Sequence, residues 1–229
     1  MKKVLLTAAA VLTMAGSAMA ASVVSSKHDL STGGPQTVYN TNTQQVCVFC
    51  HTPHNSKETR ALWNRNSATS TSYKLYTSGV WAEQASWFES GQKGVIKSDS
   101  PSLMCMSCHD GSSLKAVVNK PKDVTALSAS SDTIGSNPAN LGTDLTNDHP
   151  INIKYADYRA NTQYSGSVAT LATEDTTTGT VGASTLKLPL AKGVTVECNT
   201  CHNVHDPANV PFLRGTMGKS ALCTACHLK

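Results

Sequence analysis

The sequence predicts a small fold with little regular secondary structure: short α-helices around four repeated motifs, long loops and a few short strands. Two observations lead to this prediction. Hydrophobic residues make up 39% of the 229 residues and aromatic residues only 5%, so the polypeptide alone can bury only a modest apolar core. All eight cysteines fall into four copies of C-x-x-C-H, at residues 47–51, 105–109, 198–202 and 223–227.

C-x-x-C-H is the attachment pattern of a c-type haem, in which two thiols bind the porphyrin and the histidine ligates the iron. Zinc sites and thioredoxin-like redox pairs also use C-x-x-C, but neither explains a histidine after every pair. We therefore expect four covalent haems, stacked so that they form most of the core. The predicted attachment residues are Cys47, Cys50, Cys105, Cys108, Cys198, Cys201, Cys223 and Cys226, and the predicted proximal ligands are His51, His109, His202 and His227.

Residues 1–20 have the pattern of a signal peptide, with Lys2 and Lys3 before an apolar run and a small-x-small cleavage pattern at residues 18–20. A membrane anchor is the alternative, but the apolar run is short and rich in Ala, Thr and Ser. The first cysteine belongs to a haem motif, which argues against lipidation after cleavage. We expect an exported, soluble protein that begins at Ala21, outside the cytoplasm where c-type haem is attached.

Charge gives no support for a nucleic-acid role. The formal charge of +4 includes the two lysines of the signal peptide, which leaves +2 for residues 21–229. Counting about +1 for each ferric iron centre and about −2 for its propionates, four haems bring the oxidised protein to about −2 and the reduced protein to about −6. No basic run offsets this negative charge.

The histidines outside the proximal positions equal the predicted haems in number. They are His28, His54, His149 and His205. A single histidine of this kind is most simply a surface or turn residue. However, the same offset of three residues after a proximal ligand occurs at both His54 and His205, too close to reach the opposite face of the same porphyrin. We therefore predict that His54 serves the haem of Cys105 and Cys108, and that His205 serves the haem of Cys223 and Cys226.

These histidines also complete an internal repeat. Each unit contains a free histidine, a C-x-x-C-H-x-x-H and a plain C-x-x-C-H, so we expect one haem-pair unit at residues 21–122 and a second at 123–229, sharing one haem core. The first unit carries a long insert, residues 52–104, whose aromatic residues we expect to pack against porphyrin faces or, alternatively, to form a binding surface. These aromatic residues are Trp63, Tyr73, Tyr76, Trp81 and Trp87.

The other segments are predicted to be scaffold. Residues 123–145 read as a polar loop, and residues 160–187 as exposed strands or turns because they are rich in Thr, Ser and Gly. Met217 is a possible axial sulfur ligand, but the supply of histidines makes it a packing residue, and the same applies to Met104 and Met106.

The chain resembles a known group of proteins in the strings HDL, CVFCHTPHN, LWNRN, CMSCHDG, DHPI, CNTCHNVHDP and CTACH. These resemble exported multihaem cytochromes with doubled C-x-x-C-H motifs, and the whole is similar to the tetrahaem cytochrome nanowires of the OmcE type. The resemblance implies haems with two histidine ligands each, in a continuous stack within a homopolymer. It also implies that a histidine of one subunit ligates a haem of the next, and His28 is the matching candidate, with His149 as the alternative.

An iron held on both faces by imidazole has no position for a substrate, so its accessible chemistry is electron transfer. We therefore expect an electron conduit rather than an enzyme, with other cytochromes or extracellular acceptors as redox partners. It would be either a filament at the cell exterior or a soluble periplasmic shuttle. A multihaem reductase would need an open iron, and a haem-storage protein would not need closely paired motifs.

Overall fold

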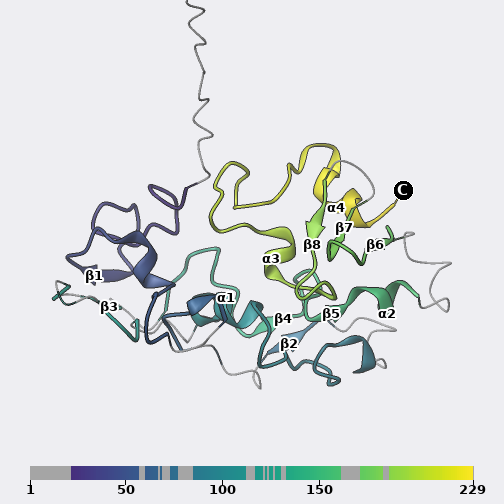
Figure 1. Ribbon diagram of the computed structural model, residues 1–229, viewed down its shortest axis with the longest axis horizontal. Coiled ribbons are helices and arrows are strands. Elements are labelled where there is room, and N and C mark those ends of the chain that lie inside the picture. Colours follow the sequence, from purple (N-terminus) through teal and green to yellow (C-terminus); the bar gives the residue numbers. More distant parts are fainter. Residues whose placement is uncertain are drawn as a thin grey trace, which may run out of the picture.

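The computed structural model describes residues 22–56, 60–66, 68, 73–76, 85–111, 117–120, 122, 124–125, 127–129, 133–160, 171–182 and 186–228 (Figure 1). The predicted signal peptide, the expected mature N-terminus at Ala21 and Trp81 lie outside these residues. No helix within the described ranges is long and apolar enough to cross a membrane.

A short helix carries each C-x-x-C-H motif, as the sequence predicts. The longest is α1 (Ser102–His109), with eight residues. Cysteines three positions apart lie on the same side of one helical turn, so both thiols can reach one group. The helices at the other motifs are η1 (Val46–Phe49), α3 (Cys198–Cys201) and α4 (Ala221–Cys226), and those elsewhere are α2 (Tyr155–Arg159), η2 (Arg60–Leu62), η4 (Ala85–Trp87) and η6 (Gly218–Ser220).

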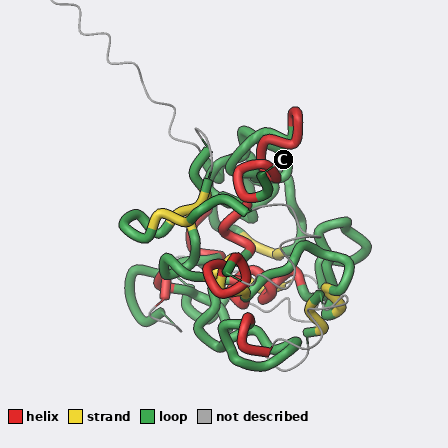
Figure 2. Tube along the Cα trace, turned by 90° about the vertical axis from the view of Figure 1, so that its right-hand side faces the viewer, coloured by secondary structure: helices red, strands yellow, loops and turns green. Residues whose placement is uncertain are grey.

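The described strands are two or three residues long and form small separate sheets, so loops make up most of the trace (Figure 2). Three pairs are β1 with β3, β2 with β4 and β5 with β9, and β6, β7 and β8 form a three-stranded sheet. Among the described pairings, only that of β2 with β4 is parallel. The bounds are β1 (Tyr39–Thr41), β2 (Lys74–Leu75), β3 (Leu127–Ala129), β4 (Asp144–Leu145), β5 (Ile153–Lys154), β6 (Glu174–Asp175), β7 (Thr180–Val181), β8 (Leu188–Pro189) and β9 (Thr195–Val196).

Two segments predicted as plain scaffold contain ordered strands. Residues 123–145 are not only a polar loop, because β3 and β4 lie within them and pair with strands of the first predicted unit. The segment 160–187 contains β6 and β7 as expected, but Val181 is fully buried rather than exposed. The pairings β1–β3 and β2–β4 thus join the two predicted units by main-chain hydrogen bonds.

The described apolar side chains form three clusters rather than one core. The first surrounds Phe88, Ile96, Leu103 and Met106, the second Val181, Leu188 and Ala225, and the third Tyr39, Val48, Phe49 and Val124. Each cluster contains residues from one or more motif helices. The division agrees with the low aromatic content, since no single cluster gathers the apolar residues of the whole chain.

Several aromatic residues of the insert lie in or beside the first cluster. Tyr73 and Trp87 are buried in it, and Tyr76 packs against it, together with residues from outside the insert such as Met106 and Ile153. Trp63 alone of the described tryptophans lies beside a proximal histidine, with its ring 5.7 Å from that of His51. Met106 is a packing residue as predicted, whereas Met217 is 54% exposed and is therefore not one.

A buried carboxylate joins the helices of the second and third motifs. Glu197, directly before α3, is 2% exposed and accepts hydrogen bonds from Ser100 Oγ at 2.8 Å and from Ser102 Oγ. Ser102 begins α1, and its hydroxyl also accepts a hydrogen bond from the Cys198 N–H at 3.1 Å. Burial raises the pKa of Glu197. This network fixes α1 against α3 across 95 residues of sequence.

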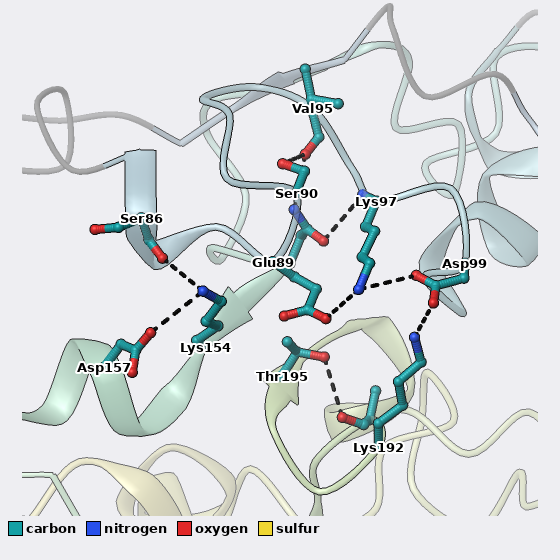
Figure 3. A network of polar contacts seen from close by, with 12 residues as sticks. Ser86, Glu89, Ser90, Val95, Lys97, Asp99, Lys154, Asp157, Lys192 and Thr195 are labelled. Atoms are coloured by element: carbon teal, nitrogen blue, oxygen red, sulfur yellow. Dashed lines mark hydrogen bonds and ion pairs between the residues drawn. The ribbon is translucent and has the colours of Figure 1, made fainter.

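A second polar network lies nearer the surface (Figure 3). Lys97 Nζ is 2.7 Å from the Glu89 carboxylate and 3.9 Å from that of Asp99, which also pairs with Lys192 of the second predicted unit. Such ion pairs in contact with solvent contribute little to stability. The network therefore orients the insert rather than holding the molecule together.

We predict that Glu197→Ala destabilises the protein far more than Glu89→Ala. Removing Glu197 leaves two buried hydroxyls without their acceptor, which costs about 1–3 kcal/mol in the free energy of unfolding. Loss of the Glu89–Lys97 pair costs much less, because both partners remain in contact with solvent. Denaturant unfolding of the purified holoprotein measures both. Equal losses in the two variants would contradict the structural role of Glu197.

Candidate metal centres

The proximal histidines are oriented by main-chain carbonyls. Nδ1 of His51 donates to the Ala61 oxygen at 2.5 Å, His109 to that of Ala139 at 2.7 Å, and His202 to that of Pro211 at 2.9 Å. A carbonyl oxygen only accepts, so the proton of each ring is on Nδ1. The lone pair of Nε2 is then free to bind a metal, which is the usual arrangement around metal-binding histidines.

Thiols of different motifs lie next to one another. The Cys50 thiol is close to that of Cys108, Cys105 interacts with Cys198, and Cys201 lies near Cys226. Burial raises the pKa of Cys50 to about 12 and that of Cys226 to about 11. None of the eight cysteines forms a disulfide. The attachment points therefore follow one another through the molecule in sequence order.

Three of the four proximal histidines face a second histidine. The ring centres are 6.1 Å apart for His51 and His205, 6.0 Å for His109 and His28, and 6.3 Å for His227 and His149. The first pair is nearly stacked, with 28° between the ring planes, whereas the other two are close to perpendicular, at 69° and 72°.

The spacing of these pairs fits one metal ion between each two rings. With metal–nitrogen bonds of about 2 Å on opposite sides of one ion, two imidazole ring centres lie about 6 Å apart. Edge-to-face ring contacts have similar separations, so the neighbouring C-x-x-C thiols are what distinguish a haem site here. The residues present therefore fit a c-type haem, which the thiols would attach and whose iron the two imidazoles of a pair would hold.

His28 has the properties expected of a buried ligand. Its Nδ1 is buried and has no hydrogen-bond partner among the described residues, and the ring packs 4.6 Å from that of Phe212. Burial, followed by the nearby His109, His202 and His205, lowers the pKa of His28 to about 4. Burial beside His149 also lowers the pKa of His227. Both rings are thus neutral at pH 7 and keep a lone pair for a metal.

The ring contacts of His205 differ from the sequence-based pairing of the second histidines. His205 lies beside His51 rather than His227, which faces His149 instead. His109, the predicted partner of His54, faces His28. The physical reason is that the C-x-x-C-H-x-x-H motifs meet each other, whereas the pairing rule assumed contact between consecutive motifs. His202 and His54 remain, and the described part of the chain shows no second imidazole at this spacing for either.

Two residues near the first motif have a structural role that the sequence analysis did not assign. Asn64 is fully buried and binds the main chain of Val48 and Asn119. Arg65 is also buried, donates to Ser107 and lies beside the Cys108 thiol. The string LWNRN was the available signal, because polar residues between two motifs can connect them.

The comparisons with known proteins agree with the haem motifs. Residues 189–229 match the family model described as a doubled CXXCH motif. A search of curated proteins finds no match. The matched region contains the third and fourth motifs, the pair closest together in sequence. The motif indicates covalently bound c-type haem, and with the sparse secondary structure it indicates a multihaem c-type cytochrome with a role in electron transfer.

Proposed function

We propose that the protein is an exported tetrahaem cytochrome that conducts electrons without catalysing a reaction, as a subunit of an extracellular filament. The observation that carries the proposal is the set of three imidazole pairs with ring centres 6.0 to 6.3 Å apart. Each pair joins a motif histidine to one of the further histidines. Ligation of both iron faces leaves no position for a substrate.

Each haem, when bound, supplies a one-electron couple of the iron. The chain's own residues hold and tune it. His51, His109 and His202 keep Nε2 directed toward the metal through their Nδ1–carbonyl bonds, and a histidine rather than a methionine as second ligand favours a lower potential. The adjacent thiols of successive motifs support a continuous series of haems.

Export and assembly are proposed on different grounds. The signal-peptide pattern of residues 1–20 supports export, and the resemblance to OmcE-type proteins supports a filament. His28 faces His109 of its own chain, so a role for His28 across subunits requires exchange of the N-terminal segment between neighbours. Such an exchange repeats one pairing in every subunit and gives an open chain. If the N-terminal segment is not exchanged between subunits, the protein would instead be a periplasmic electron shuttle.

A reductase is the second candidate function, favoured by one observation. His202 has no partner imidazole at ligating distance within the described residues, so its iron could be open. The purified native protein decides between the two. We predict four covalently attached haems by mass spectrometry and a fully low-spin absorption spectrum, with no binding of carbon monoxide at neutral pH. One haem that binds carbon monoxide readily in the native protein would favour the reductase.

The filament is tested through His28. We predict that His28→Ala opens one haem, that of Cys105 and Cys108, because His109 loses its partner ring. Electron microscopy of material sheared from producing cells should show filaments for the wild type and none for the variant if the N-terminal segment is exchanged.

The matched control is His149→Ala, which removes the equivalent histidine of the second unit. It should also give one high-spin haem, that of His227, but should leave assembly intact. Wild-type protein that is monomeric at the cell surface and in solution would support the shuttle. Filaments that persist in His28→Ala would show that His28 acts within its own chain.

A further inference from the structure

The two C-x-x-C-H-x-x-H motifs fold into the same local structure. We call residues 47–56 and 60–64 the first haem hairpin, and residues 198–214 the second haem hairpin. In the first, Thr52 N–H donates to the Leu62 oxygen at 3.0 Å, and in the second Asn203 N–H donates to the Phe212 oxygen at 2.7 Å. The proximal histidine donates through Nδ1 to the residue before each of these acceptors.

The equivalence extends to the bridges and to the backbone angles. His51 forms an isolated antiparallel bridge with Trp63, and His202 forms one with Leu213. Leu62 and Phe212, the matching acceptors, both have positive φ, at 50° and 61°. A left-handed conformation is rare for side chains of this size. Its occurrence at the same place in both hairpins shows that they are two copies of one structure.

The free histidines are equivalent in the same way. His28 faces the plain motif of the first unit, and His149 faces the plain motif of the second, with nearly equal ring separations and ring angles. The pair of His28 with His109 in the first unit thus corresponds to the pair of His149 with His227 in the second unit. Of the three histidine pairs, the one that crosses between the units is that of His51 with His205, between the two haem hairpins.

We infer that the two haem hairpins exchange their second histidines, so that His54 ligates the iron bound by His202 just as His205 ligates the iron bound by His51. The inference rests on the proposed function, because it assigns the last ligand of the same four irons. A two-fold relation between the equivalent hairpins would turn the contact of His51 with His205 into a contact of His202 with His54.

The spacing along the chain agrees with this exchange. His54 follows His51 by three residues, and His202 precedes His205 by three residues. Two segments that pass each other in opposite directions, with His51 opposite His205, would place His54 on the side of His202, although the rings of His54 and His202 are not in contact in this structure. His54 is exposed, so no packed core has to open for its ring to reach that position.

The variant His54→Ala tests the exchange in purified holoprotein. All four haems should remain covalently attached, because no cysteine or proximal histidine changes. One haem should become high-spin and bind one carbon monoxide per chain, and added imidazole should restore the low-spin spectrum. Pro53→Ala, an exposed neighbouring change, should bind no carbon monoxide and controls for loosening of the turn.

Double variants locate the opened iron. His54→Ala combined with each of His28→Ala, His149→Ala and His205→Ala should bind two carbon monoxide molecules per chain, because each pair removes ligands from different irons. If His54 instead serves the haem of Cys105 and Cys108, the combination with His28→Ala binds only one. That result would overturn the exchange, and so would a His54→Ala protein that stays fully low-spin.

Wild-type monomers separate this inference from the proposed function. If monomers isolated by gel filtration are fully low-spin, His54 acts within its own chain as inferred. If they bind one carbon monoxide that is lost on assembly, His54 serves a neighbouring copy, and the exchange within the chain is wrong while the electron-transfer function stands. A protein with an open iron in every state would contradict the proposed function itself.

Discussion

The spacing of the paired imidazole rings is the constraint on which the structure depends. A separation of about 6 Å between ring centres lies within the range of direct ring contacts, and it also equals the separation of two imidazoles bound to one metal ion. Three such pairs recur in this chain, drawn from segments as far apart as His51 and His205. The loops between the motifs thus bring histidines that are distant in the sequence close together.

The polar interactions of the protein serve this geometry. Main-chain carbonyls set the rotation of His51, His109 and His202, and the network of Glu197 with Ser100 and Ser102 sets the position of one motif helix against another. Three small apolar clusters then fix the loops around the sites. None of these features alone resembles a large hydrophobic core, which agrees with a chain in which only 5% of residues are aromatic.

The sequence predicts the motif helices, the scarcity of regular structure and the repeated units, because each depends on local patterns. It does not predict which second histidine meets which motif. That pairing depends on contacts such as His51 with His205, whose residues are separated by most of the chain. The burial of Val181 and the pairing of β3 with β1 were missed for the same reason, since Thr-, Ser- and Gly-rich segments carry no signal of their distant partners.

The angle between paired rings divides the sites into two kinds. The rings of His51 and His205 are nearly parallel, whereas those of the two pairs within units are nearly perpendicular. Parallel imidazoles on one iron would interact with the same d orbital, and perpendicular imidazoles with two different ones. If each pair holds a haem iron, the ring angles would therefore give the irons different magnetic anisotropies and different energies for the transferred electron, although every ligand is an imidazole.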